Sequence, residues 1–129
     1  MAAEGNEAVV RTAYEAFARQ DIPGVLATFD PDIEWHTPDE LPFGGEVRGH
    51  DGVVGFFQSL PTYFEELHVE PDTFVASDDR VVAIGHHRGR IKGQPFDAGF
   101  AMAWIMRNGK AIAFLEYNDS GKILRLLEG

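Results

Sequence analysis

The sequence predicts an α+β fold, in which helices near the start of the chain pack on one side of a strongly curved antiparallel sheet. Residues 7–19 place apolar side chains at helical spacing. From residue 67 onward, long segments with alternating apolar positions indicate strands. Asn108-Gly109, between two of these segments, is the strongest hairpin signal in the chain. No repeat, low-complexity tract or linker divides the 129 residues, so we expect one domain over residues 1–129.

Three helices are expected to accompany the first part of the sheet. Asp21 can cap a second, short helix, and Asp51 can cap a third helix over residues 51–60. The first helix, residues 7–19, has an apolar face suited to burial against the sheet. That face carries Val9, Val10, Ala13, Tyr14 and Phe17.

The remaining elements are strands, apart from one long loop and a final helix. Residues 33–38 predict a short strand, and residues 38–50, rich in glycine, proline and charge, predict a loop. Asp119 or Ser120 can cap a short C-terminal helix. Turns are expected at residues 77–80 and 92–95 and at Asn108-Gly109, and the long strands cover residues 67–76, 81–91, 96–106 and 110–118.

The length of these strands has a consequence for the interior. Strands of about ten residues twist and curl strongly, so helices on one face leave a concave pocket between themselves and the sheet. The outward side chains of the last two strands are also apolar and require a cover. They include Ala101, Ala103, Ile105, Leu115 and Tyr117. A second copy of the chain would bury this face, so we expect a homodimer through the outer face of the sheet.

Composition restricts the classes of partner. The formal net charge of −10 argues against nucleic acid and against an anionic membrane surface. The chain has no cysteine, which excludes disulfides, thiol nucleophiles and cysteine–zinc sites. No apolar run is long enough to cross a membrane, and the first residues do not resemble a signal peptide, so we expect a cytoplasmic protein.

Four strings of residues resemble a known family. These are AVVRTAYEAFARQDIPGVLATFDPDIEWHTP, GGEVRGHDGVVGFF, DRVVAIGHHRGR and NGKAIAFLEYND. They are similar to the SnoaL-like polyketide cyclases and ketosteroid isomerases of the nuclear transport factor 2 superfamily. The resemblance implies a conical sheet around a pocket whose mouth faces the helices, and frequent dimers through the outer face. It specifies the chemistry poorly, because this fold hosts isomerases, cyclases, dehydratases, epoxide hydrolases and binders without activity.

Glu116 is the leading candidate for a catalytic residue. It lies in FLEYND, on a strand whose two faces are both largely apolar, and the resemblance places it where related epoxide hydrolases have a catalytic aspartate. His87 faces the same side of the sheet and could form a carboxylate–imidazole pair with it. The structural alternatives are a glutamate held by a tryptophan indole or an arginine, and a hydrogen-bonded core histidine.

The other candidates are expected to bind the ligand. They share the inward strand faces or the apolar face of the first helix, where small-molecule sites are lined by bulky side chains with a few polar groups. These candidates are Tyr14, Trp35, Thr37, Met102, Trp104, Phe114 and Asn118. Ile112 is expected on the same face as Phe114.

Neither a metal nor a cofactor is expected. His86 and His87 are adjacent on a strand, so their side chains point to opposite faces and cannot chelate one ion together. Steroid isomerase chemistry is not expected either, because the family's aspartate base falls at Thr37. Its two oxyanion donors fall at Ala13 and near Met102.

Two functions follow from these residues. The first is a cofactor-free enzyme that abstracts a proton beside a carbonyl, in an isomerisation, cyclisation or dehydration, or that hydrates its substrate. Its substrate would be a small apolar or cyclic molecule, with Glu116 moving the proton and His87 assisting. The second is a ligand-binding or dimerisation module of the same fold without catalysis.

Overall fold

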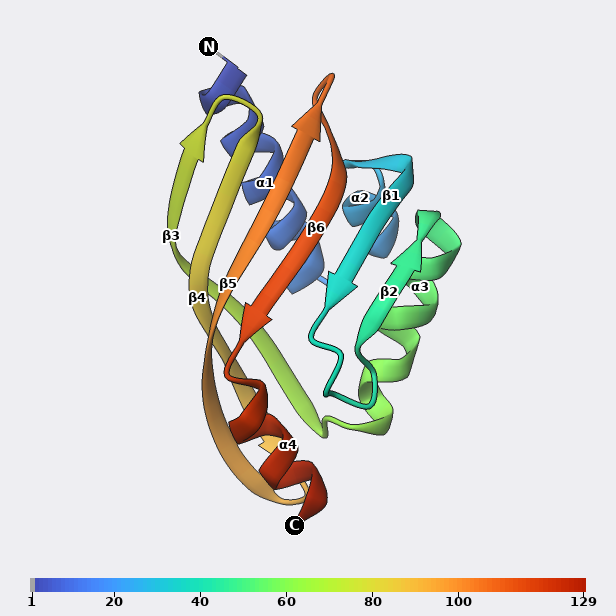
Figure 1. The fold of residues 1–129 in the computed structure, drawn as a ribbon, viewed down its shortest axis with the longest axis vertical. Coiled ribbons are helices and arrows are strands. Elements are labelled where there is room, and N and C mark those ends of the chain that lie inside the picture. Colours follow the sequence, from blue (N-terminus) through green and yellow to red (C-terminus); the bar gives the residue numbers. More distant parts are fainter. Residues whose placement is uncertain (1) are drawn as a thin grey trace.

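The computed structural model describes residues 2–129 and contains one six-stranded sheet, with helices that cover one of its faces (Figure 1). The helices are α1 (Ala2–Ala18), α2 (Ile22–Leu26), α3 (Gly49–Ser59), the 3₁₀ turn η1 (Leu60–Thr62) and α4 (Ser120–Glu128). The strands are β1 (Phe29–Thr37), β2 (Gly45–Arg48), β3 (Glu66–Ser77), β4 (Arg80–Ile91), β5 (Gln94–Arg107) and β6 (Lys110–Asn118). They lie in the order β2-β1-β6-β5-β4-β3. The predicted α+β class is confirmed.

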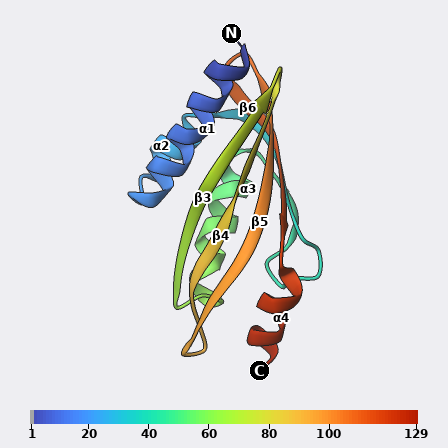
Figure 2. The same cartoon turned by 90° about the vertical axis from the view of Figure 1, so that its left-hand side faces the viewer.

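The layers place the interior between the sheet and the first three helices. Helix α1 contacts β3 and β4, and α3 contacts β1 and β2. Figure 2 shows α1 and α2 on one side of the bent sheet and α4 at its lower end, where α4 contacts β5. The opposite face of the sheet has no helix along most of its length (Figures 1 and 2). No helix within residues 2–129 is long and apolar enough to cross a membrane.

The predicted turns and two of the predicted caps are present. Asn108 and Gly109 both have positive φ, as a two-residue hairpin turn of the type I′ class requires. The Asp21 side chain accepts a hydrogen bond from the Gly24 backbone N–H at the start of α2. The Asp119 side chain accepts one from Lys122 at the start of α4. Local side-chain chemistry therefore fixes these boundaries.

Other boundaries differ from the prediction. Helix α3 begins at Gly49, after Arg48, so Asp51 lies in its first turn and is not its cap. Strand β2, Gly45–Arg48, lies in the segment predicted as a loop, because four residues between glycines carry too little pattern to indicate a strand. Strand β1 begins at Phe29 and runs through Asp30-Pro31-Asp32, which is accommodated by a shift in its register with β6.

The sheet is mixed, whereas the sequence predicted only antiparallel pairs. Strands β3 to β6 form the expected antiparallel meander, which starts at the far edge of the sheet and ends beside β1. Strand β6 then runs parallel to β1. This pairing joins segments near the two ends of the sequence, so no local turn signal could indicate it.

Two glycines in β4 allow β3 to come close to its inner face. A Cβ atom at Gly85 would lie 2.1 Å from the carbonyl oxygen of Glu70, and one at Gly89 would lie 1.9 Å from that of Glu66. Next to Gly85, the pairing of β3 with β4 shifts register between Pro71 and Thr73. The glycines and the bulge together let these long strands curl around the interior.

We therefore predict that Gly85→Ala destabilises the protein. The added methyl group would collide with backbone atoms, and overpacking of this kind costs about 1–3 kcal/mol. The matched control is Gly99→Ala in β5, where a Cβ atom would meet nothing closer than 3.9 Å. Urea unfolding followed by circular dichroism measures both free energies. Equal midpoints for the two variants would contradict the close approach at Gly85.

Candidate active site

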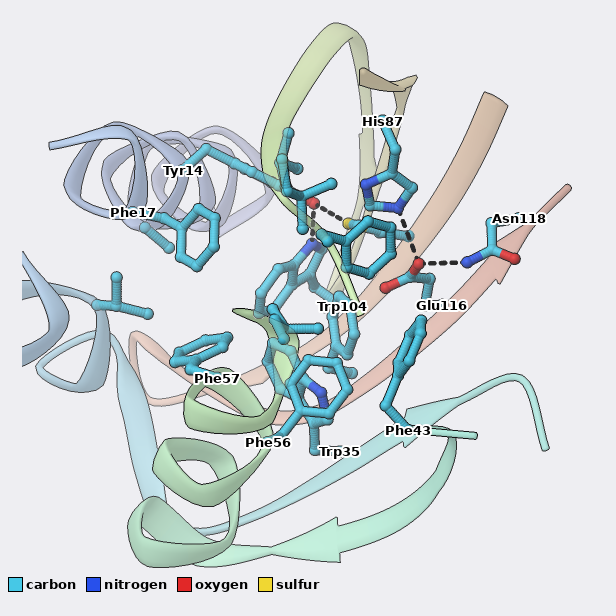
Figure 3. A pocket seen from close by; sticks show the side chains of 18 of the residues that line it. Tyr14, Phe17, Trp35, Phe43, Phe56, Phe57, His87, Trp104, Glu116 and Asn118 are labelled. Carbon is cyan, nitrogen blue, oxygen red and sulfur yellow. Dashed lines mark hydrogen bonds and ion pairs between the residues drawn. The ribbon is translucent and has the colours of Figure 1, made fainter. Parts of the chain in front are cut away.

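A cavity lies between the inner face of the sheet and helices α1 to α3 (Figure 3). Aromatic and aliphatic side chains form almost all of its wall, and Tyr14, His87, Glu116 and Asn118 bring a hydroxyl, an imidazole, a carboxyl and an amide group to it. The centre of a water molecule can occupy about 70 Å³ inside it, whereas one water needs about 10–15 Å³ on the same measure. The cavity therefore has room for several water molecules. A ring compound that is larger than this space would enter it only if aromatic side chains of the wall moved.

A histidine and a glutamate meet inside this apolar wall. The Nε2 atom of His87, on β4, lies 2.9 Å from the Oε2 atom of Glu116, on β6. The side chains of the two residues are only 8% and 10% exposed. An ionised carboxylate can only accept, so Nε2 carries the hydrogen of this bond. The other ring nitrogen of His87, Nδ1, is buried and has no partner within residues 2–129.

Asn118 holds the same carboxylate oxygen. Its Nδ2 group donates to Oε2 of Glu116 over 2.5 Å, and its own Oδ1 atom is buried without a partner. Both donors thus share Oε2 (Figure 3). Oε1 of Glu116 has no hydrogen-bond partner among residues 2–129, which leaves it free for a ligand. The carboxylate is oriented through one oxygen and available through the other.

Tyr14 brings a hydroxyl group to the cavity from α1. The Nε1–H of Trp104 donates to this hydroxyl over 3.0 Å, and the hydroxyl donates to Sδ of Met102 over 2.9 Å. Burial raises the pKa of Tyr14 far above its ordinary value, the hydrogen bond from Trp104 opposes this shift, and the charge of Glu116 adds to it. Tyr14 therefore remains protonated, and its hydrogen is directed at a thioether, which is a weak acceptor.

Comparison with known proteins identifies the family. A family model described as a SnoaL-like domain matches residues 2–123. The chain belongs to the SnoaL-like family. An NTF2-like protein of unknown function from Burkholderia pseudomallei is 36% identical to this SnoaL-like domain, with a TM-score of 0.91 over 97% of this chain and 98% of the other.

Two further relatives show how far the family match reaches. The crystal structure of TerC, co-crystallised with polyporic acid, is 29% identical, with a TM-score of 0.91 over 97% of this chain and 99% of that chain. An uncharacterised protein of Mycobacterium tuberculosis is 25% identical over 111 residues, which are 84% of this chain and 85% of the relative. The family and the fold are therefore shown, and the reaction of this SnoaL-like domain is a separate question.

The structure brings most of the predicted site residues of the SnoaL-like domain together. Those that line the cavity are Tyr14, Trp35, His87, Met102, Trp104, Phe114, Glu116 and Asn118. Glu116 is held by His87 and Asn118, and not by an indole or an arginine. The indole N–H of Trp104 donates to Tyr14, and that of Trp35 is buried without a partner in the described chain. The roles of these residues remain predictions.

Two predicted positions differ. Thr37 does not line the cavity but a second hollow on the outer side of the sheet, where its hydroxyl contacts the Gly45 carbonyl at 3.4 Å. Ile112 was expected beside Phe114 on the inner face and instead lines a hollow on the outer face with Ile105. A β-bulge opposite Ile105 and Met106 shifts the alternation at this position.

The sequence missed the aromatic side chains that close the cavity from the helix side. Phe43 lies in a segment predicted as a loop, and Phe56 and Phe57 are adjacent on α3 and so could not both be assigned to one face. Their rings pack on one another and on Trp35 at centroid separations of 5.6 to 6.3 Å. The high phenylalanine content, ten in 129 residues, was the only available signal.

The side chains of His86 and His87 point to opposite faces of the sheet, as predicted. His86 points outward and contacts Asp97 at 2.6 Å, away from the buried His87. Within residues 2–129, Glu34, His36 and Glu46 could approach one ion, with ligand atoms within 4.8 Å of one another. However, the guanidinium of Arg48 already lies between the two carboxylates, 3.6 Å from Glu34 and 3.0 Å from Glu46. We therefore assign no metal to this group.

We predict that Tyr14 does not ionise while the protein is folded. Its raised pKa means that the unfolded chain loses this proton first, so folding stability falls as pH rises above about 10. Absorbance at 295 nm during alkaline titration measures tyrosinate. Tyr14→Phe should leave the increase in absorbance below the unfolding pH unchanged, because the buried Tyr14 does not contribute to it. A smaller increase in the variant would show that Tyr14 titrates in the native state.

Proposed function

We propose that this SnoaL-like domain binds a small, largely apolar ligand in the cavity and moves a proton on it without a cofactor. The observation that carries the proposal is the buried contact between His87 and Glu116 inside an aromatic wall (Figure 3). Apolar walls with a few convergent polar groups are typical of small-molecule sites. Buried ionisable pairs occur often at functional sites, so the burial of this pair supports the proposal.

Glu116 is the proton acceptor in this proposal. Its Oε1 atom is free, while His87 and Asn118 fix the carboxylate through Oε2. A positioned carboxylate can take a proton from a carbon next to a ligand carbonyl and return it at another position, which is an isomerisation. The same abstraction begins a ring closure or the loss of water. His87 orients the carboxylate through the hydrogen bond to Oε2 in the apolar surroundings.

Tyr14 is placed to bind the oxygen of the ligand. Its hydroxyl remains protonated, and its present acceptor, the thioether of Met102, is weaker than a carbonyl or enolate oxygen. The hydrogen bond from Trp104 holds the hydroxyl in position. A ligand carbonyl at this place would gain a preorganised donor as negative charge develops on its oxygen.

The comparison with TerC supports a ring compound as the ligand. TerC was co-crystallised with polyporic acid and is 29% identical to this chain, with coverage of 97%. The aromatic rings of Trp35, Phe56, Phe57 and Phe114 provide flat apolar surfaces to such a molecule. Polyporic acid is therefore a suitable first compound for binding experiments.

A binding role without turnover is the second candidate, and one observation favours it. Three buried polar atoms at the cavity, Nε1 of Trp35, Nδ1 of His87 and Oδ1 of Asn118, have no partner within residues 2–129. An unpaired buried polar atom costs about 1–3 kcal/mol, and a ligand that pairs with these atoms would remove that cost. Such a gain requires no proton transfer.

We predict that the wild-type protein accelerates hydrogen–deuterium exchange beside the carbonyl of 2-tetralone in heavy water, measured by mass spectrometry. Glu116→Gln should lower the rate at least about a hundredfold, the lower range for a general base. The matched control is His86→Gln, on the outer face, which should keep the wild-type rate. Displacement of bound Nile red measures whether tetralone enters the cavity. Entry without accelerated exchange would refute the enzyme and favour the binding module.

We further propose that the chain forms a homodimer through the outer face of the sheet. Ile84, Val75 and Tyr117 are 46%, 55% and 60% exposed there. In the ladder, Ala101 lies beside Tyr117, and Ala103 lies between Val82 and Leu115, so the apolar residues form a continuous surface. Large exposed apolar surfaces on soluble proteins usually mark contacts.

We predict that wild-type protein sediments at twice the 14.3-kDa mass of the chain and that Ala103→Asp sediments as a monomer. A carboxylate at the centre of the apolar surface would be desolvated on association without a partner. Ser77→Asp, at the exposed end of β3, serves as the control and should remain dimeric. A monomeric wild type, at concentrations up to about 100 μM, would rule out a stable dimer.

A further inference from the structure

Two hollows meet at the proposed catalytic carboxylate. One is the apolar cavity, and the other is the second hollow that Thr37 lines, which we call the outer hollow. Only Glu116 and Asn118 line both of them. These two side chains are hydrogen-bonded to each other over 2.5 Å. They therefore form a partition with an interior, apolar side and an exterior side.

The partition lies where the sheet wall ends. Strand β1 pairs in parallel with β6 as far as His36 opposite Leu115. Thr37 is the last residue of β1, and Pro38, which has no N–H to donate to a ladder, follows it. β6 continues through Glu116 to Asn118 with β5 as its partner on one side only. The outer hollow occupies the space that a longer β1 would fill.

The chemistry of the outer hollow differs from that of the cavity. Most of the residues that line it are polar, and three of its acids are Asp39, Glu40 and Glu46. The centre of a water molecule can occupy about 540 Å³ of it, against about 70 Å³ in the cavity. Water therefore fills the outer hollow readily, and its negative charge attracts protons and repels anions.

We propose that the outer hollow is the route by which water and protons reach Glu116, separate from the cavity that takes the ligand. This inference rests on the proposed function, in which Glu116 moves a proton. A ligand that fills the apolar cavity removes water from the inner side of the carboxylate. A proton that Glu116 has taken from the ligand either returns to the ligand or passes to a water in the outer hollow, and Asn118 holds the carboxylate where both are possible.

The test measures how fast solvent exchanges the hydrogen in the bond between His87 and Glu116. In ¹⁵N-histidine-labelled, ligand-free protein, this ring N–H is identified by its loss in His87→Gln, and its exchange with water is followed by NMR. Thr37→Leu fills the outer hollow, and Ala13→Leu, the matched control, fills the cavity from α1. Thr37→Leu should slow the exchange at least about tenfold, and Ala13→Leu should leave it within about twofold of wild type.

Each outcome decides the route. Slower exchange in Ala13→Leu, with wild-type exchange in Thr37→Leu, would show that water comes through the cavity and would overturn the proposal. Equal rates in all three proteins would do so too. Circular dichroism and thermal unfolding confirm that each variant folds, and Thr37→Met, whose flexible side chain also fills the hollow, replaces Thr37→Leu if that variant does not. The measurement involves no turnover, so it stands apart from the tetralone experiment.

Discussion

A carboxylate inside an aromatic wall requires hydrogen-bond donors around it, and this requirement governs the geometry of the interior. Transferring an unpaired charge into apolar surroundings costs several kcal/mol, so Glu116 can remain there only because His87 and Asn118 donate to it. These donors come from β4 and β6, with β5 between them. A slip of one residue in the β5–β6 register would turn Glu116 to the outer face and leave His87 buried without a partner.

The contact between His87 and Glu116 depends on the curl of the sheet. In the strand pairing, His87 lies opposite Ala98 of β5, and Glu116 lies opposite Met102 of the same strand. The two partners on β5 are thus four residues apart. The imidazole crosses this offset by leaning over Phe100, with ring centroids 4.9 Å apart. Gly85 and Gly89 flank His87 on the inner face of β4 and let β3 approach it closely. The small residues on either side of the histidine are thus part of the site, although they carry no functional group.

The sequence predicted the parts of the structure that local chemistry determines and missed those that depend on distant segments. Alternation placed Phe114, Glu116 and Asn118 on the inner face, because β6 is regular beyond its bulge. It failed at Ile112, since a bulge is defined by the partner strand and has no signal of its own here. The alternation pattern also failed at Thr37, because it gives the face to which a side chain points but not the residue at which pairing with the next strand ends. The pairing of β1 with β6 was equally inaccessible, for it joins the two ends of the fold.

The same distant pairing explains why one carboxylate can be both buried and connected to solvent. An aromatic cavity binds ligands by excluding water, whereas a group that moves protons must exchange them. A residue in the middle of a complete sheet would satisfy the first condition only. Glu116 lies one residue beyond the last pair of β1 with β6. There β6 is the edge strand of the sheet, and acidic residues line the outer hollow beside it. Pro38 ends β1 and thereby determines which residue of β6 lies between the apolar cavity and the water-filled outer hollow.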